Sequence, residues 1–417
     1  TVHAYDITMD GVSERVIASS QAISLAVESK PPAIAVLPFK NMSDDEDQEY
    51  FADGVTEDII SALSTWKTFP VISRNSSFSM KGQNLASVEI ASQLGARYLV
   101  EGSIRKGGNK VRITASLNDA ETGQQIWSKR WDRLLEDIFD VQDEVSQEIA
   151  VIVEPTLKGQ EQKKLSYKTS VFGAWDKYLQ ALSAFYKAAD YVTVHALCDA
   201  AIALDANICD PYVLKCKILY LRIFDPNFDS ERAANEKDFH ALSRKAYTLD
   251  QGNPDAVVML SRSFNLTKEL DQRIAYAEKA LNLNPSHAAA NYDYGLAISN
   301  EGKATQALDY VYRAIELNPA EHQEYEFMLP VLYMAAADSG KAGYWIEKLY
   351  QRSGHNRYLG WAAAVEANLG NLKVASQKLK AFLELRPEIK SMQDYEAVTP
   401  EIIKHYVMPG LKSIWPS

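Results

Sequence analysis

The sequence predicts a two-part protein, in which a mixed α/β domain over residues 31–157 precedes an all-helical repeat domain over residues 172–417. In the first part, apolar strand-like segments alternate with helical patterns, and three successive segments then switch to a period of two. From about residue 172 these signals stop and a 34-residue period begins, which indicates stacked helical hairpins. Residues 1–30 are expected to be a remnant or linker after an upstream domain, and residues 158–171 a linker between the two parts.

The composition is that of a soluble globular protein. At 417 residues, with 47% hydrophobic and 24% charged residues, the chain exceeds one ordinary core. The net charge of −11 argues against nucleic-acid binding, which calls for concentrated Lys and Arg. No apolar run predicts a membrane span or a signal peptide. Three irregularly spaced cysteines (Cys198, Cys209 and Cys216) favour structural thiols in a reducing compartment, so we expect a cytoplasmic protein.

The α/β domain is expected to begin with two strand–helix units and to continue as a meander. "AIAVLPF" (33–39) predicts a buried strand, and apolar residues recur at helical spacing over 54–65. "FPVISR" (69–74) predicts a second strand, and "SVEIASQLGA" a second helix that ends at a glycine. Three period-two segments, "RYLVEGSIRK", "NKVRITASLND" and "QQIWSKRWD", predict antiparallel strands joined by tight turns. "IFDVQDEVSQEIAVIVEPTL" predicts an amphipathic helix, so the sheet should be mixed and covered by helices.

Closing prolines mark the repeat. "KALNLNP" ends at Pro285 and "RAIELNP" ends 34 residues later at Pro319. Two further steps of 34 residues lead to Ser353 and to Pro387 in "FLELRP". Earlier units are expected around "RKAYTLD" and "DAAIALD", separated by an insertion near "FDPNFDSERAANEK". The region should therefore hold about five or six helix pairs.

The repeat resembles the tetratricopeptide repeat. In the clearest unit Gly295, Ala307, Ala314 and Pro319 occupy that repeat's positions for small residues and for the closing proline. Small side chains let two antiparallel helices approach closely, and the proline ends the second helix. Neighbouring units depart from the pattern at positions that usually hold glycine or alanine, namely Ser261, Arg273 and Lys348.

No catalytic constellation is visible in the sequence. Lys303 and Lys341 follow glycines, but Ala297 and Ala335 stand where a phosphate-binding loop needs its upstream glycine. The seven histidines form no HExxH pair and lie near no cysteine pair at zinc spacing. We therefore predict that this chain is not an enzyme, and that it has no catalytic residue, no metal site and no cofactor.

The stretch "NMSDDEDQEYFADGVTED" allows two interpretations. Its carboxylates could offer oxygens to Mg²⁺ or Ca²⁺, but it lacks the spacing of an EF-hand loop, and consecutive carboxylates cannot all converge on one ion. We instead expect a solvated loop whose charges favour the positive end of a helix over 54–65, with Asp53 as its cap. The carboxylates concerned are Asp44, Asp45, Glu46, Asp47 and Asp53.

Two smaller features of the meander also allow two interpretations each. "RKGGNK" and the strand after it carry basic residues that could bind an anion, although a charged hairpin tip is usually only solvated. Trp127 and Trp131 alternate along the last strand with the same facing, and we expect core packing rather than a stacking platform. The basic residues are Arg105, Lys106, Lys110 and Arg112.

The repeats are expected to bind a protein or peptide partner. The first helix of each pair in such repeats usually lines a concave groove, and its inward positions mix charged, amide and aromatic groups that suit an extended peptide. The competing interpretation is the ordinary polar face of a solenoid. The candidate partner-binding residues are Arg262, Asn265, Tyr292, Asp293, Asn300, Glu326, Tyr333, Arg357, Trp361 and Asn368.

The segment from about Ile34 to Ile152 resembles a module of bacterial signalling proteins that is called TolB-like, after the amino-terminal domain of a periplasmic protein. The resemblance rests on "AIAVLPFKNMSDDEDQEYFADGVTEDIISALS", "FPVISRNSSFSMKG", "IASQLGARYLVEGSIRKGGNKVRITASLNDAETGQQIWSKRWDR" and "DIFDVQDEVSQEIA". Tetratricopeptide repeats follow the module in that family, as here, and the closing "PEIIKHYVMPGLKSIW" is similar to the family's usual terminus.

In that family the module usually forms the carboxy-terminal part of a class III adenylate cyclase or of a winged-helix transcriptional regulator. "VHAYDI" resembles the last strand of a class III cyclase domain, which implies that the catalytic domain lies upstream. The resemblance thus implies a non-catalytic part that binds a partner or ligand and controls cyclic AMP synthesis. The sensor half of a transcription regulator and a general protein-binding scaffold remain open alternatives, as does a homodimer.

Overall fold

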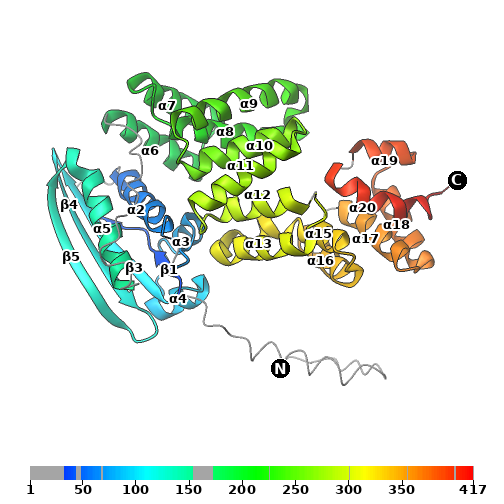
Figure 1. Cartoon of the computed structure of the whole chain (residues 1–417), viewed down its shortest axis with the longest axis horizontal. Helices are drawn as coiled ribbons and strands as arrows, with labels where there is room; N and C mark the ends of the chain where they lie inside the picture. The colour runs from blue at the N-terminus through cyan, green and yellow to red at the C-terminus, as the bar shows by residue number, and fades with distance from the viewer. Residues whose placement is uncertain are drawn as a thin grey trace.

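In the computed structural model an α/β domain lies beside the first four of a row of helical hairpins that runs to the C-terminus (Figure 1). The structure describes residues 32–43, 48–66, 69–153, 172–224, 226–299, 301–354, 356–398 and 401–416. The segment "VHAYDI", the carboxylates at positions 44–47 and the candidate Asn300 lie outside the described residues. The predicted combination of a small mixed sheet with a mainly helical remainder is confirmed.

The sheet is mixed, as the sequence indicated. Its long central strand β3 pairs in parallel with β1 and β2 and antiparallel with β4, and β4 pairs antiparallel with β5. The segment 69–74, expected to be a full strand, forms only a bridge between Val71 and Ile34, because the chain turns away at Ser73. The strands are β1 (Ile34–Val36), β2 (Lys40–Asn41), β3 (Tyr98–Gly107), β4 (Lys110–Asp119) and β5 (Gln124–Leu134).

Helices cover both faces of the sheet. Ile34 and Val36 of β1 share a core with α2 and α5, whereas Ala35, which points the other way, packs with α4. Trp131 is buried in the first core beside Trp127, and its indole N–H donates to Glu144 over 2.8 Å, so the expectation of core packing is confirmed. The helices of this domain are α2 (Glu49–Ser64), α3 (Arg74–Phe78), α4 (Ser87–Leu94) and α5 (Ile138–Val153).

Asp53 does not cap a helix over 54–65, contrary to the sequence-based expectation. Helix α2 begins five residues earlier, at Glu49, so Asp53 lies inside it. Its carboxylate pairs with Lys81, which also reaches Glu49 at 2.8 Å. An ion pair with a lysine that follows α3 therefore stabilises this helical turn.

The helical domain consists of antiparallel hairpins stacked side by side (Figure 1). The described residues contain six of them, with α14 and η5 (Pro319–Glu321) leading into the fifth and α19 and α20 following the sixth. The predicted insertion corresponds to η4 (Pro226–Glu231) and the start of α9. The helices are α6 (Phe172–Tyr186), α7 (Tyr191–Leu204), α8 (Asp210–Ile223), α9 (Arg232–Leu249), α10 (Pro254–Leu266), α11 (Leu270–Leu283), α12 (Ala288–Ser299), α13 (Ala304–Leu317), α14 (His322–Glu326), α15 (Leu329–Ala335), α16 (Ser339–Ser353), α17 (Arg357–Asn368), α18 (Leu372–Leu385), α19 (Met392–Val398) and α20 (Glu401–Lys412).

The departure from the repeat pattern at Ser261 has a local explanation. In the regular unit, a Cβ at Gly295 would lie 2.9 Å from the carbonyl oxygen of Ala307, so the two helices touch there. One repeat earlier, the buried hydroxyl of Ser261 donates to the carbonyl oxygen of Arg273, which is the equivalent acceptor, over 2.9 Å. The hairpin therefore replaces a close backbone contact with a hydrogen bond.

Candidate functional site at the domain junction

The α/β domain is attached to the first hairpin by an aromatic contact, which we call the first anchor. Phe51 of α2 meets the ring of Trp175 of α6 edge-on at 5.5 Å, and the hydroxyl of Tyr50 donates to Asp176 over 2.7 Å. A Cβ at Gly54 would lie 2.4 Å from the side chain of Leu179. The glycine in "FADGVTED" therefore allows two helices to pack closely, which is a structural role rather than phosphate binding.

A second anchor joins the short helix α3 to the turn after α13. The hydroxyls of Ser73 and Ser76 donate to the side-chain oxygen of Asn318 over 2.7 and 2.6 Å. The backbone N–H of Ser73 donates to the carbonyl of Leu317 over 2.8 Å, and that of Ala320 donates to the Ser76 hydroxyl over 3.0 Å. The second anchor therefore combines backbone and side-chain bonds.

Further bonds extend the second anchor to the previous repeat and secure its centre. The backbone N–H of Val71 donates to the hydroxyl of Ser286, in the turn before α12, over 3.4 Å. The Asn75 amide donates to Glu321 over 2.5 Å, and the amide of Asn318 also reaches Glu321, over 3.0 Å. Two consecutive repeat turns therefore hold the α/β domain, and the donors and acceptors between them fix its orientation.

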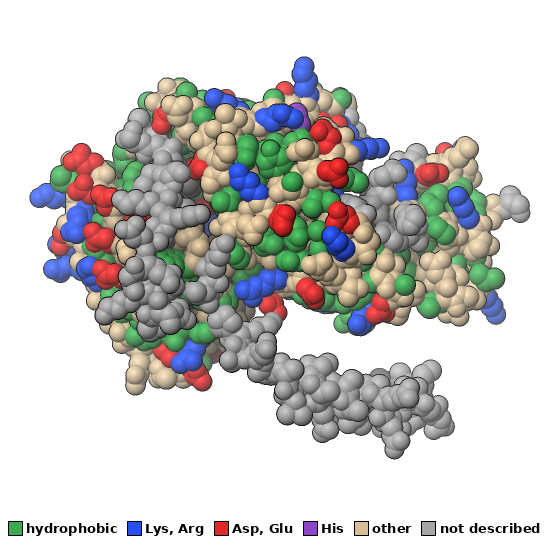
Figure 2. Space-filling model, in the orientation of Figure 1, with side chains coloured by type: hydrophobic (Ala, Val, Ile, Leu, Met, Phe, Trp, Pro, Cys, Tyr) green, Lys and Arg blue, Asp and Glu red, His purple; other side chains and the backbone are tan. Residues whose placement is uncertain are grey.

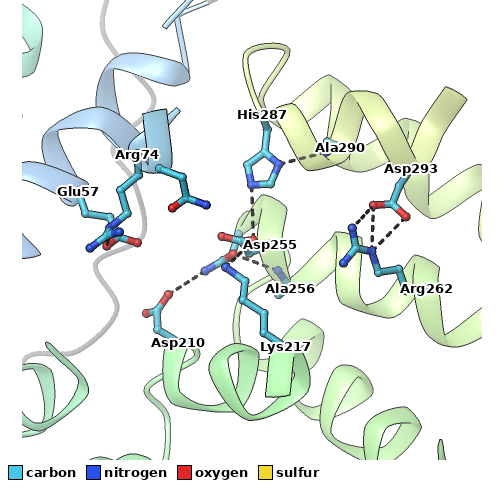
Figure 3. A network of polar contacts seen from close by, with 12 residues as sticks. Glu57, Arg74, Asp210, Lys217, Asp255, Ala256, Arg262, His287, Ala290 and Asp293 are labelled. Atoms are coloured by element: carbon cyan, nitrogen blue, oxygen red, sulfur yellow. Dashed lines mark hydrogen bonds and ion pairs between the residues drawn. The ribbon is translucent and has the colours of Figure 1, made fainter. Parts of the chain in front are cut away.

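Between the two anchors, polar side chains of both domains face one another (Figure 3). Arg74 of α3 donates through Nε to Glu57 of α2 over 2.8 Å. Across from them, Lys217 of α8 lies 3.1 Å from Asp255 of α10, which also lies 3.5 Å from His287. Tyr186, the last residue of α6, lies under the Arg74 guanidinium, with its ring centroid 3.6 Å from Cζ. We call the group formed by Glu57, Arg74, Tyr186, Lys217 and Asp255 the junction cluster.

The charged side chains of the junction cluster are partly buried and partly exposed to water. About a third of the Lys217 and Asp255 side chains is exposed, 31% and 34%. Burial alone would raise the pKa of Asp255, but Lys217 and His287 hold it well below its usual range. Burial would lower the pKa of Lys217, but Asp255, Tyr186 and Glu57 raise it. Both groups are therefore charged at neutral pH, and they form an ion pair in which each charge offsets the other.

The structure brings three of the predicted partner-binding residues together on the inner helices. Arg262 of α10 makes a two-pronged ion pair with Asp293 of α12, at 2.7 to 3.1 Å (Figure 3). Tyr292 packs on Tyr325 with ring centroids 5.1 Å apart. Asp293 is buried and Arg262 mostly so, which means that this pair ties two hairpins together.

Two other candidates are held by contacts within the fifth hairpin and its neighbours. The buried carboxylate of Glu326 pairs with Arg352 at 2.5 Å and with Lys348 at 3.2 Å. The hydroxyl of Tyr333 lies 2.8 Å from that of Tyr312. The lysine at the usual alanine position of this repeat, Lys348, thus compensates a buried acid.

The remaining candidates lie further along the repeats or outside this cluster. Trp361 is buried between Phe327 and Tyr358, so it belongs to the core, and Arg357 lies over the Phe327 ring. Asn265 of α10 is half-buried, and Asn368 is exposed at the end of α17. The candidates therefore do not form one continuous surface.

Sequence reasoning did not identify the residues of the two anchors. The polar run "SRNSS" at 73–77 follows a strand-like segment and supplies most of the second anchor. The many hydrogen-bonding side chains in this run could have indicated a polar contact. The side chains that accept their hydrogen bonds, however, lie more than 200 residues away in the sequence. At the hairpin tip, Arg105 and Lys106 donate to the carbonyl of Met42 and to Gln48. Within the described part of the chain, these two basic residues thus have structural partners.

The described residues show neither a metal site nor a membrane-crossing helix. No group of three or more His, Cys, Asp or Glu side chains in those residues is arranged to hold a metal ion. Across the same part of the chain, no helix is both long and apolar enough to cross a bilayer. On the face that Figure 2 shows, basic and acidic side chains are intermixed, without a field of one sign.

Comparison with known proteins relates part of this chain to a protein named as a putative adenylate cyclase. No family model matches the chain. The chain is 34% identical over 257 residues to a protein named putative adenylate cyclase 3 from Rhizobium meliloti (strain 1021). The match covers 60% of this chain and 44% of that protein, so the chain spans less than half of the relative's length.

Two solved structures illustrate the likeness, and each matches only part of this chain. YrrB, described as a TPR protein with an unusual peptide-binding site, is 20% identical with a TM-score of 0.35, and the match covers 48% of this chain and 96% of YrrB. TolB from Acinetobacter baumannii is 18% identical with a TM-score of 0.23, covering 30% of this chain and 29% of TolB.

Proposed function

We propose that this chain is the regulatory, protein-binding part of a bacterial adenylate cyclase, located in the cytoplasm and without catalytic residues of its own. The similarity to the putative adenylate cyclase of Rhizobium meliloti carries the proposal. The stacked hairpins add support, because repeats of this kind present extended surfaces to partner proteins. The N-terminal domain would then be the TolB-like module that the sequence resembles.

The proposed partner surface is the inner face of the repeats, where a peptide or a partner surface would be recognised. Its candidates are the ten residues that the sequence suggested, and the cluster around Arg262 and Tyr292 is the best supported part. Aromatic and arginine side chains at the centre of a contact surface usually carry much of the binding free energy. The buried Trp361 would act by shaping the surface rather than by touching the partner.

The proposed control requires the partner to bind two arrangements of the protein with different affinity. The second anchor supports such coupling, because a shift of the turn at Asn318 would displace α3 and, through the Ile72–Ile34 backbone bond, strand β1. The α/β domain would pass this shift to a catalytic domain in the parent protein.

The test measures cyclic AMP synthesis by two proteins. One is the full-length parent protein, and the other is a form of it that lacks residues 32–416. Regulation predicts a changed basal rate, or loss of the response to a cell extract, in the shortened form. The side chain of Arg262 is mostly buried, so Asn265→Ala is the preferred point variant on the inner face, with the exposed Lys380→Ala on α18 as matched control. Equal rates and equal responses in both forms would contradict the proposal.

A further inference from the structure

Strand β5 forms a free edge of the sheet. One side of it pairs with β4, and no described residue pairs with the other side. Figure 1 shows β5 on the outer side of the α/β domain, away from the helical hairpins. A free edge presents a row of backbone N–H and C=O groups that can bind a further strand.

The backbone of β5 lacks the features that usually keep edge strands from pairing. Many edge strands are short, contain a proline or carry a bulge that twists the edge away. β5 is 11 residues long and contains no proline, and its shift in register against β4 lies near its start, between Gln125 and Trp127. The stretch from Trp127 to Leu134 is therefore regular and long enough to pair with another strand.

The charges of β5 that lie on the same face as Trp131 are compensated within the chain. Lys129 pairs with Glu148 of α5 at 2.5 Å, and Arg133 lies 3.7 Å from Glu144 of the same helix. Side chains two positions apart in a strand share a face, so both basic residues lie beside α5. Their repulsion toward an approaching strand is therefore reduced by the two glutamates.

The opposite face of β5 carries two exposed side chains of opposite charge. Arg130 and Asp132 are 63% and 52% exposed and lie 3.5 Å apart, and Arg112 of β4 also pairs with Asp132. The edge thus offers both signs of charge within a few residues. A uniformly acidic strand would meet Asp132, and a uniformly basic strand would meet Arg130, so a strand that itself carries both signs fits best.

The β5 strand of a second copy satisfies this pattern in one register. Directly opposed residues of an antiparallel pair share a face, so the two-fold axis must pass through a residue position. An axis at Trp131 places Arg130 of each copy opposite Asp132 of the other. An axis at Arg130 or at Asp132 would oppose like charges, and an axis at Lys129 or Arg133 would leave both without an opposite charge. The axis at Trp131 does oppose Lys129 to Arg133, the two residues that α5 compensates.

We propose that two copies of this chain associate through β5, antiparallel and with the two-fold axis at Trp131. The two sheets then form one continuous sheet, and two reciprocal Arg130–Asp132 pairs cross the axis. The inner face of the repeats takes no part in this contact. The inference is independent of the proposed function, since it requires neither a partner protein nor cyclic AMP synthesis.

The first test is sedimentation velocity of the whole chain over a series of concentrations, where we expect a reversible dimer. Arg130→Asp sets two carboxylates against each other at both pair positions, so the dissociation constant should rise about 10-fold or more. Arg130 is exposed, so the fold should be preserved, which thermal unfolding checks. Lys380→Glu on α18 makes the same change in charge at a 79% exposed side chain and, as the matched control, should leave the dimer unchanged.

The second test mixes two variants that should each fail to pair with themselves. Asp132→Arg sets two guanidinium groups against each other, but in a mixture with Arg130→Asp opposite charges meet at both pair positions. We therefore expect the mixture to form a one-to-one dimer. Asp132→Arg also removes the partner of Arg112, so its thermal unfolding is measured first, and Arg130→Asp decides alone if that variant does not fold.

Three results would overturn the proposal. The first is an unaltered chain that stays monomeric at every concentration, and the second is an Arg130→Asp dimer as tight as that of the unaltered chain. The third is a mixture of two folded variants that does not associate.

Discussion

The hydroxyl of Ser76 donates to the side-chain oxygen of Asn318 over 2.6 Å, although 242 positions separate the two residues. Asn318 is buried, and it accepts a second hydroxyl from Ser73 on the same oxygen. The asparagine of the repeat motif "LNP" is thus used twice, once to end a helix and once to hold another domain. This relationship makes the junction testable by substitution.

We expect Asn318→Ala to lower the free energy of unfolding by about 2–4 kcal/mol, because both serine hydroxyls lose a buried acceptor. The matched control is Asn284→Ala, one repeat earlier, whose side-chain oxygen accepts from the backbone N–H of Ser286 in its own turn and, among the described residues, makes no bond to the α/β domain. Urea unfolding of the two variants measures the difference. Equal losses would mean that the interdomain bonds add nothing to the turn's own stability.

Gly295→Ala should destabilise the fourth hairpin by about 1–3 kcal/mol, because the new methyl would lie 2.9 Å from a backbone oxygen that cannot easily move. Gly343→Ala in α16 is the control, since its methyl would meet Val365 at 3.8 Å, an ordinary contact. There the change should be neutral or stabilising by roughly 0.5–1 kcal/mol, through helix propensity. Thermal unfolding distinguishes the two, and a harmless Gly295→Ala would refute the close packing.

The Arg262–Asp293 pair should behave as a coupled unit. Asp293→Leu alone leaves a largely buried guanidinium uncompensated and is expected to cost about 3–5 kcal/mol. Adding Arg262→Met should recover much of that loss, because the charge is removed with its partner. A double-mutant cycle by urea unfolding gives the coupling free energy. Additive losses would show that the pair contributes no specific stabilisation.

Asp255 should contribute to acid sensitivity. Its folded-state pKa lies well below the ordinary value of 3.8, so the stabilisation is complete above that value and is lost as the pH falls through the folded pKa. Asp255→Asn should therefore show a smaller loss of stability than the unaltered chain between about pH 5 and pH 2. Urea midpoints across that range measure it, with the exposed Asp309→Asn on α13 as control. Parallel curves for the unaltered chain and Asp255→Asn would contradict the assignment.

The regular parts of the fold could be predicted because they repeat a simple pattern. Strand β4 alternates in sequence because every second one of its residues is buried. The 34-residue period is visible because Ala246, Ala280 and Ala314 each fill the same fully buried position of successive hairpins. In both cases the signal lies within one element or one repeat.

The rest could not be predicted because it depends on partners distant in sequence. "FPVISR" has the composition of a strand, but the backbone N–H of Ser73 bonds to Leu317 instead of extending the ladder. The inner positions of the repeats could be counted, yet the pairing of Arg262 with Asp293 and the burial of Trp361 could not. Residues such as Arg74 and Tyr186 carried no signal at all, since only the docked domains bring them together.

The two anchors also limit how the repeat array can change in length. The first anchor holds α6 and the second holds the turns on either side of the fourth hairpin, so α7 to α11 bridge a fixed span, as in a closed ring. Inserting or deleting one hairpin inside that span would carry Asn318 away from α3. Beyond η5, no hydrogen bond or aromatic contact of either anchor reaches the described residues, so units can be added or lost there without disturbing the ring. The two anchors therefore favour growth by duplication toward the carboxyl end.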